Sequence, residues 1–328
     1  PHFLPPPPEA KNRRLTRLDL ARWLVSRDNP LTARTLVNRL WKEFFGQGLA
    51  PVLDDLGAQG EAPSHPELLD WLAVEFMERG WDVKHIVKLM VTSATYRQTA
   101  NLRLELKDLD PNNRLLAAQN PRRLEAEFVR DNALFIAGLL NPELGGPSAY
   151  PYQPPGYYAQ LQFPDRDYHA NTDARQYRRG VYAHWQRTFL QPMLANFDSP
   201  SREECTANRV VSNTPQQMLT LLNDPPNVEA ARVFAEWVLK AKCDSDEERI
   251  ELVFQRALAR PAKAGEKSSL LSFLKGQREH YRADAGESVK LAKVGLAPAP
   301  EGLAPAELAA WTQVCRVVLN LHETITRY

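Results

Sequence analysis

The sequence lacks any apolar run long enough to cross a membrane. A spanning helix needs about 20 predominantly apolar residues, and charged or polar residues interrupt every apolar stretch of the 328-residue chain well before that length. An excess of one charge sign is also missing, because 41 lysines and arginines stand against 40 aspartates and glutamates. Since nucleic-acid binding depends on clustered positive charge, these absences argue against a membrane-spanning protein and against a dedicated nucleic-acid binder.

Cysteine is scarce as well. Cys205, Cys243 and Cys315 form neither a CxxC nor a CxxCH pattern, which argues against a zinc knuckle and against a haem c attachment site. We expect free cysteines that pack as small hydrophobes, although one pair could form a bridge. No second histidine accompanies His65 at the spacing of metal ligands. The sequence therefore predicts neither a metal site nor a cofactor within this chain.

The sequence contains many residue patterns that are typical of helix starts. Capping residues and prolines predict helix starts at Asn29-Pro30, Ser64–Glu67, Asp82, Asn120-Pro121, Asn213–Pro215 and Ser245–Glu248. Apolar residues follow each start at helical spacing. We expect Phe128 and Phe135 to face inward on the fourth of these helices, and Met218 and Leu219 on the fifth. The last helix is expected to carry one apolar face from Leu308 to Ile325.

Residues 141–212 differ from the rest in composition. Clusters of glycine and proline interrupt helix formation there, and seven tyrosines gather in the same segment. The residues from Arg179 to Trp185 predict a short strand, because their β-propensity is high and no helical stripe appears. Loops of this length in a compact chain are usually functional or cover a core. This segment is therefore the first place to look for a ligand.

These patterns predict a mainly α fold with two helical lobes, an aromatic loop region and at most a small β-hairpin. The predicted parts are a proline-rich linker at residues 1–14, a helical lobe at 15–140, the loop-rich segment at 141–212 and a second helical lobe at 213–328. Four consecutive prolines, Pro5 to Pro8, favour a stiff polyproline II spacer. Because this opening is typical of an interdomain linker, we expect the chain to be part of a longer protein.

The candidate ligand-binding residues lie in the loops and are Tyr157, Tyr182, His184, Asp198, Arg202 and Arg209. No recognised catalytic motif accompanies them, such as a GxSxG elbow or a cysteine-nucleophile signature. One interpretation is that Asp198, Arg202 and Arg209 form a buried ion-pair network that holds the loops, because the planar fork of arginine pairs well with carboxylates. A second is a carbohydrate platform made of tyrosines. A third is glycoside hydrolysis by two carboxylates drawn from Asp165, Asp167, Asp173 and Asp198.

Several motifs of the chain resemble those of one domain family. They occupy residues 29–34, 37–41, 45–49, 60–72, 91–98, 197–202, 213–217, 222–225 and 309–321, in order along nearly the whole chain. One of them reads Phe197-Asp198-Ser199-Pro200-Ser201-Arg202. The family that they resemble is the C-terminal domain of unknown function found in planctomycete cytochrome c-containing proteins.

This resemblance implies a setting and no mechanism, because the family has no established activity. It implies an exported protein of the periplasm or cell surface, with an upstream haem c domain and a second uncharacterised domain as partners. In that setting we expect an accessory or binding module that engages a partner domain or an extracellular polymer such as a glycan. The alternative is a hydrolase-like enzyme domain that acts on extracellular polysaccharide through the loops around Asp198 and Arg202.

Overall fold

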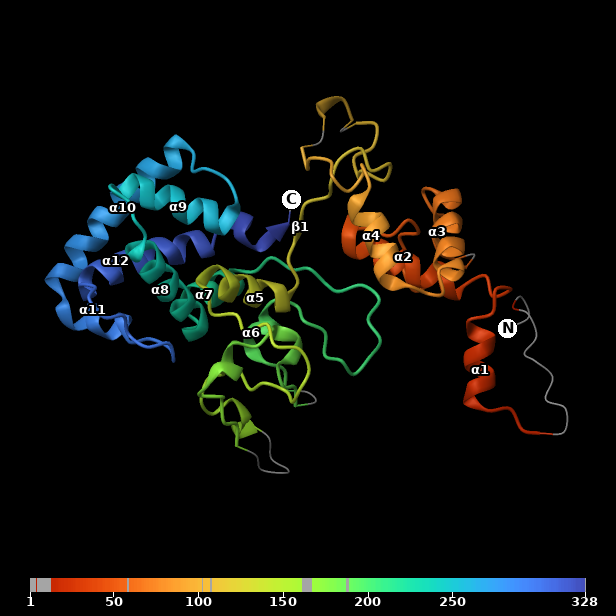
Figure 1. The fold of residues 1–328 in the computed structure, drawn as a ribbon, viewed down its shortest axis with the longest axis horizontal. Helices are drawn as coiled ribbons and strands as arrows, with labels where there is room; N and C mark the ends of the chain where they lie inside the picture. Colours follow the sequence, from red (N-terminus) through yellow and green to blue (C-terminus); the bar gives the residue numbers. More distant parts are fainter. Residues whose placement is uncertain are drawn as a thin grey trace. The chain divides into compact units, whose positions relative to one another are not determined.

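The computed structural model describes residue 4 and residues 13–57, 59–101, 103–106, 108–160, 167–186 and 189–327. Within these residues the chain is mainly α-helical, as predicted, and it forms two compact units. The first unit ends at Arg122 and the second runs from Arg123 to Arg327. Figure 1 labels α1 to α4 in the first unit and α5 to α12 in the second. The predicted polyproline spacer, Pro5 to Pro8, lies outside the described residues.

The first unit contains α1 (Arg17–Leu24), α2 (Thr32–Phe45), α3 (Pro66–Glu78) and α4 (Val83–Thr92), followed by the 3₁₀ turn η1 (Leu104–Leu106). Leu31 occupies the N-cap of α2, two residues after the predicted cap, although the side-chain oxygen of Asn29 accepts hydrogen bonds from the amides of Leu31 and Thr32 at 3.0 and 3.3 Å. Gly46 ends this helix with a φ of +86°, a conformation that glycine adopts without a steric penalty. The start and the stop of α2 both follow from local sequence.

The apolar faces of α2, α3 and α4 form one core. Trp41 and Phe45 of α2 stack with ring centroids 3.9 Å apart. Phe76 of α3 and Ile86 of α4 are buried in the same cluster. The predicted inward face of α2 is therefore confirmed at its centre, and burial of these side chains removes apolar surface from water.

One predicted cap in this unit is confirmed and another is wrong. Asp82 caps α4, because its carboxylate accepts a hydrogen bond from the amide of His85 at 3.1 Å. The predicted capping box at Ser64 does not form: His65 occupies the N-cap position of α3 and makes no capping bond with its side chain. Ser64 instead donates its backbone amide to the oxygen of Leu49 at 2.9 Å, and this bond ties the preceding loop to the start of α3.

The second unit is organised around α8 (Pro225–Lys240). This helix packs along α12 (Pro305–Leu319), and α9 (Asp246–Leu258), α10 (Ala264–Ala283) and α11 (Ala285–Ala292) surround the pair. Phe234 of α8 and Trp311 of α12 are fully buried there. The capping patterns do not predict α8, because a proline pair resembles a stop signal. Pro225 and Pro226 nevertheless fit the first helical turn, where amides have no helical partner.

Two buried charged residues of α8 hold the loop between α11 and α12. Arg232 donates three hydrogen bonds to backbone oxygens of that loop, those of Val294, Ala297 and Pro298. Glu229 accepts hydrogen bonds from Tyr177 and from the amides of Leu296 and Ala297, at 2.6 to 2.7 Å. These bonds satisfy charges that would otherwise be costly to bury. The loop is therefore fixed to the core helix.

The fourth predicted helix, α5 (Ala126–Ala137), begins later than predicted. Residues Arg122–Arg123 first form strand β1, which pairs with β2 (Thr326–Arg327) in a two-stranded sheet. The prediction that Phe128 and Phe135 face inward is wrong, because they are 51% and 68% exposed. The buried face of α5 carries small residues such as Ala133, which allow it to pack closely on α8. For the same reason α5 belongs to the second unit, and the boundary lies at Arg122 instead of near residue 140.

Helix α7 (Pro215–Asn223) has the predicted start but the opposite face. Thr214 and Gln217 form a capping box at its first turn, yet Met218 and Leu219 are each 57% exposed, and Leu221 is buried. The start of α9 is confirmed, because the Ser245 hydroxyl accepts a hydrogen bond from the amide of Glu248 at 3.2 Å. A correctly predicted helix start therefore does not determine which face of that helix is buried.

The end of the chain departs from prediction at the last helix. Helix α12 stops at Leu319, and Ile325 lies in the separate 3₁₀ turn η5 (His322–Ile325) instead of on the helical face. The three cysteines are free: Cys205 is exposed, Cys243 half-buried and Cys315 buried. Burial raises the pKa of the Cys315 thiol, which fits the expected packing role.

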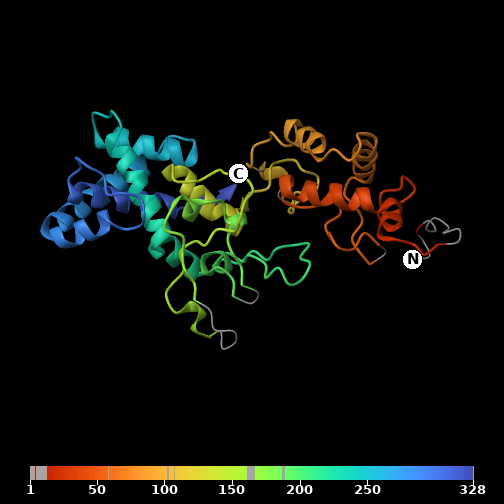
Figure 2. The same cartoon turned by 60° about the horizontal axis from the view of Figure 1, so that its bottom comes forward.

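The loop-rich segment joins α5 to α7 and contains α6 (Pro192–Asn196) and the 3₁₀ turns η2 (Tyr157–Gln160), η3 (Ala174–Tyr177) and η4 (Gly180–Tyr182). The strand predicted from Arg179 to Trp185 is wrong, because η4 occupies its centre and a single parallel bridge joins Ala149 to Ala183. Figure 2 shows this segment, in yellow-green and green, beside α5 and α6. The loops therefore lie next to the helices whose ends form the candidate site.

Candidate functional site

Asp198 is the centre of a hydrogen-bond network in the second unit. Its carboxylate accepts hydrogen bonds from the Arg123 guanidinium at 2.7 Å and from the hydroxyl and amide of Ser212 at 2.7 and 2.9 Å. Burial opposes the charge, but the hydrogen bonds from Arg123 and Ser212 outweigh it and hold the pKa of Asp198 below its ordinary value. This carboxylate is therefore ionised and fully engaged in holding the loops.

Arg209 is paired in a similar way. Its guanidinium donates to both carboxylate oxygens of Glu127, at 2.6 and 3.4 Å, and forms an ion pair with Glu125 at 3.2 Å. Asp198 thus pairs with Arg123, and Arg209 pairs with Glu127, so the ion pairs among the described residues differ from a network formed by Asp198, Arg202 and Arg209. A carboxylate bound on both oxygens by a guanidinium has little capacity left for a ligand.

Arg202 differs from both of these residues. Its guanidinium carbon lies 4.0 Å from the centroid of the Trp185 ring, a stacking geometry that favours the cation. Burial lowers the pKa of Arg202, while the nearby Glu127 acts in the opposite direction. Within the described residues, Arg202 makes no hydrogen bond and no direct ion pair.

The aromatic candidates hold the loops together. The Tyr182 hydroxyl accepts a hydrogen bond from the amide of Gly145 at 2.8 Å. His184 stacks on Tyr150 with ring centroids 4.4 Å apart, and Tyr157 packs edge-on against Phe189. These three candidates are each engaged within the protein. Asp165, one of the acids considered for hydrolysis, lies outside the described residues.

A groove of about 430 Å³ opens where α6, α7 and the start of α8 meet. Amide, hydroxyl, aromatic and apolar groups line it, together with a single carboxylate among the described residues: Tyr152, Pro154, Gln191, Pro192, Met193, Asn196, Gln216, Leu219, Thr220, Asn223, Asp224 and Pro225. Its volume falls in the range of small-molecule sites. None of the six predicted site residues is among those that line it.

Asp224 is the ionisable residue of this groove. It is the single residue between α7 and α8. Burial raises its pKa to about 6, and the neighbouring Arg130 guanidinium opposes that rise. Its carboxylate makes no hydrogen bond within the part of the chain that the structure describes. A partly buried acid without a hydrogen-bond partner costs folding free energy, so a role in binding would explain its presence.

Arg130 of α5 supports the site from inside the protein. It is 4% exposed, and it donates hydrogen bonds to the backbone oxygens of Arg178 and Gln176 at 2.7 and 2.6 Å. Asp131 lies 3.6 Å from the same guanidinium and accepts a hydrogen bond from the amide of Gly180 at 2.7 Å. These bonds attach the loop-rich segment to α5.

Replacement of Asp224 with asparagine is expected to stabilise the second unit at neutral pH. The folded state holds the Asp224 proton more tightly than the unfolded state, so wild-type stability falls as pH rises from about 4 to about 6. Because asparagine does not ionise, the free energy of unfolding of the variant should exceed that of the wild type by about 2 kcal/mol at pH 7 and should not differ near pH 4. Urea unfolding at several pH values measures the difference, with Asp244→Asn as an exposed control. An equal pH dependence in Asp224→Asn and wild type would contradict the buried position of this carboxylate.

The sequence-based search missed Asp224 and Arg130 for different reasons. Asp224 belongs to the motif at residues 222–225, where the patterns indicate a helix end and no chemistry. Arg130 belongs to a charged helical stretch that is typical of a solvated face. The available signal was the proline pair after Asp224, since prolines at the start of a helix place the preceding aspartate at an N-cap.

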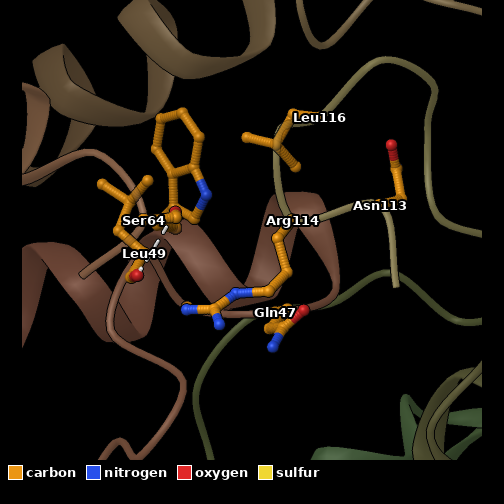
Figure 3. Close-up of a pocket in the computed structure, with 8 residues that line it drawn as sticks. Gln47, Leu49, Ser64, Asn113, Arg114 and Leu116 are labelled. Carbon is orange, nitrogen blue, oxygen red and sulfur yellow. Dashed lines mark hydrogen bonds between the residues drawn. The ribbon is translucent and has the colours of Figure 1, made fainter. Parts of the chain in front are cut away.

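Two cavities in the first unit are weaker candidates. Figure 3 shows one, in which the Arg114 side chain lies beside Gln47. Its space, about 10 Å³, holds no more than a water molecule. The other, of about 660 Å³, is lined by Arg39 and Asp54 among others. Arg39 and Asp54 are exposed to solvent, and the half-buried Asp55 accepts a hydrogen bond from the amide of Gly57 at 2.7 Å, so it has the partner that Asp224 lacks among the described residues.

A membrane-spanning helix and a metal-binding cluster are both missing from the part of the chain that the structure describes. No helix among the described residues has the length and apolar character needed to span a membrane. The described residues also contain no group of three or more histidine, cysteine, aspartate or glutamate side chains arranged to hold a metal ion.

Comparison with known proteins identifies a family. The profile of the family described as a protein of unknown function, DUF1553, matches residues 16–274. Neither curated proteins nor solved structures gave a match. Because the matched region covers most of the chain and includes the groove, the chain belongs to the DUF1553 family.

Proposed function

We propose that the second unit is a non-catalytic binding module that holds a polyhydroxylated segment, such as part of a glycan, in the groove at Asp224. The observation that carries the proposal is an unpaired, partly buried carboxylate lining a groove of about 430 Å³. A carboxylate accepts two hydroxyl hydrogen bonds at once. Hydroxyl groups of a ligand would supply the partners that Asp224 lacks within the described protein.

The rest of the groove has the mixed surface that a sugar ring needs. Tyr152 and three prolines offer apolar faces, and the exposed side chains of Gln216 and Asn223 offer amide groups. Aromatic side chains stack on the apolar faces of such ligands, while the polar groups select their hydroxyls. This composition favours a neutral polyol over a purely apolar ligand.

Hydrolysis is the less favoured function. Acid and base catalysis of glycosidic bond cleavage needs two carboxyl groups on either side of the bond. Asp224 is the one carboxylate that lines the groove among the described residues. Asp198, the acid named in the hydrolase alternative, is held by Arg123 and Ser212, so it is not available as a second catalytic group.

The resemblance to planctomycete cytochrome c-containing proteins supports a setting for this module. In that setting the protein is exported, and an upstream haem c domain and a second uncharacterised domain precede the chain. We propose that the module anchors those partners to an extracellular polymer. Detection of the intact protein in the periplasm or at the cell surface would test the location independently of any ligand.

A glycan-binding screen with two groove variants tests the proposed function. Neutral oligosaccharides are screened on an array, and the tightest is measured by calorimetry with wild-type protein, Asp224→Asn and Leu219→Arg. Loss of a charge-assisted hydrogen bond corresponds to about 1.5–3 kcal/mol, so Asp224→Asn should weaken binding about tenfold or more. Leu219→Arg should block the groove, because Leu219 lines it and its exposure leaves the core intact.

Met218→Arg is the matched control for this experiment. Met218 precedes Leu219 on α7 and is equally exposed, at 57%, but it is not among the groove residues. The proposal predicts normal binding in Met218→Arg and weak binding in Leu219→Arg. Equal binding by both variants, or the absence of any neutral glycan ligand, would refute the groove as a saccharide site.

A further inference from the structure

Three buried polar groups in or near the segment from Phe197 to Arg202 have no hydrogen-bond partner among the described residues. One is the hydroxyl of Ser199, which is 8% exposed. The indole nitrogen of Trp185, whose ring lies under Arg202, is buried without an acceptor. The Nε of Arg123, whose guanidinium contacts Phe197, is also buried without an acceptor among the described residues. Since buried polar groups in proteins are nearly always satisfied, three such groups around one segment call for an explanation.

Arg202 adds a complete guanidinium to this set of donors. One of its faces rests on Trp185 at 4.0 Å from the ring centroid, so the edge that carries its N–H groups is free to meet a ligand. The nearest carboxylate that acts on it is Glu127, whose two oxygens are already bound by Arg209. No acceptor among the described residues uses Arg202.

The backbone of the segment is held in an unusual conformation. Asp198 and Arg202 both have a φ of +63°, in the left-handed region that non-glycine residues rarely occupy. The hydrogen bonds from Arg123 and Ser212 to Asp198 fix the start of the segment. Strained positions held by surrounding contacts are frequent at binding sites, because such contacts pre-position side chains for a ligand.

We propose that Arg202, stacked on Trp185 at the end of this segment, binds an oxyanion carried by a ligand, either a carboxylate or a sulfate ester. An oxyanion is acceptor-only, and two of its oxygens match the planar fork of a guanidinium. It therefore supplies the acceptor that the Arg202 guanidinium lacks among the described residues. The Arg202 site is separate from the groove, and the inference rests on the proposed function in taking an oligosaccharide as the ligand that carries the oxyanion.

The test uses the full chain with three oligosaccharides of equal length: a neutral one, a uronic acid oligomer and a sulfated oligomer. Calorimetry at fixed ionic strength compares wild-type protein with Arg202→Gln, Arg202→Lys and Arg175→Gln. Arg175 is an exposed arginine of the same unit, paired with Asp173, so its variant controls for loss of one positive charge. Arg202→Gln should weaken binding of the preferred anionic oligomer at least tenfold, and Arg202→Lys should weaken it less.

The two anionic oligomers distinguish the two sources of the oxyanion, because a carboxylate site prefers the uronic acid oligomer and a sulfate site prefers the sulfated one. Equal losses in Arg202→Gln and Arg175→Gln, or the failure of both anionic oligomers to bind wild-type protein, would overturn the inference. Asp224→Asn separates it from the proposed function. Binding of the neutral oligomer depends on Asp224, whereas the additional affinity for an anionic oligomer depends on Arg202 and should persist in Asp224→Asn.

Discussion

Replacement of Arg130 with methionine is expected to lower the free energy of unfolding of the second unit by about 3–5 kcal/mol, the cost of breaking a buried pair from one side. Arg130 supplies the hydrogen bonds to the backbone oxygens of Arg178 and Gln176. Its removal leaves these oxygens without donors and leaves the buried carboxyl of Asp131 without its nearest positive charge. Amide hydrogen exchange in α5 and α8 measures the loss within this unit alone.

The control for Arg130→Met is Arg175→Met. Arg175 is 55% exposed at its side chain and pairs only with Asp173 among the described residues. Exposed ion pairs contribute at most about 1 kcal/mol, so this variant should remain close to wild type. A similar small effect in Arg130→Met would mean that water reaches the guanidinium and that the site behind the groove is not buried.

Gly295→Ala is expected to destabilise the second unit by about 3 kcal/mol, from backbone strain together with overpacking. Gly295 has a φ of +92°, and an added Cβ would lie 2.1 Å from the Cδ of Glu229. Glu229 has little freedom to move away, because Tyr177, Leu296 and Ala297 donate hydrogen bonds to it. The melting temperature and the exchange of the α8 amides both report this change.

Gly302→Ala separates the two causes of that effect. Gly302 has a φ of +77°, but no atom lies within 4 Å of an added Cβ. This variant therefore measures the cost of the left-handed backbone alone, about 1 kcal/mol. If Gly295→Ala were no more destabilising than Gly302→Ala, the close approach of Glu229 to Gly295 would not exist in solution.

Helix starts were predictable from sequence wherever a short polar side chain satisfies amides of its own first turn. Asp82, Thr214 and Ser245 all do so, because these interactions lie within about three residues. The inward face of α5 was not predictable in the same way. Its alanines pack against the alanines of α8, and this close approach leaves Phe128 and Phe135 outside. Burial here depends on a partner helix that lies about 100 residues away in sequence.

The candidate site likewise contains some residues that could be found from the sequence and others that could not. Sequence reasoning located the loop charges Asp198 and Arg209 but not their partners, because Arg123 and Glu127 lie far away in the sequence. It did not find Asp224, because the properties that single out this residue are burial and the absence of a partner. Both depend on Arg130 and on the groove walls, which come from α6, α7 and the start of α8. Such properties arise only after distant segments pack together.

The junction between α7 and α8 has a consequence for how sequences of this kind can diverge. Asp224 alone connects the two helices, so the joint has no spare length. Each residue of an α-helix advances its direction by about 100°, so an insertion or deletion at this point would swing one groove wall away from the other. Substitutions can change the groove surface gradually, whereas a change in the length of this joint would remove the groove in a single step.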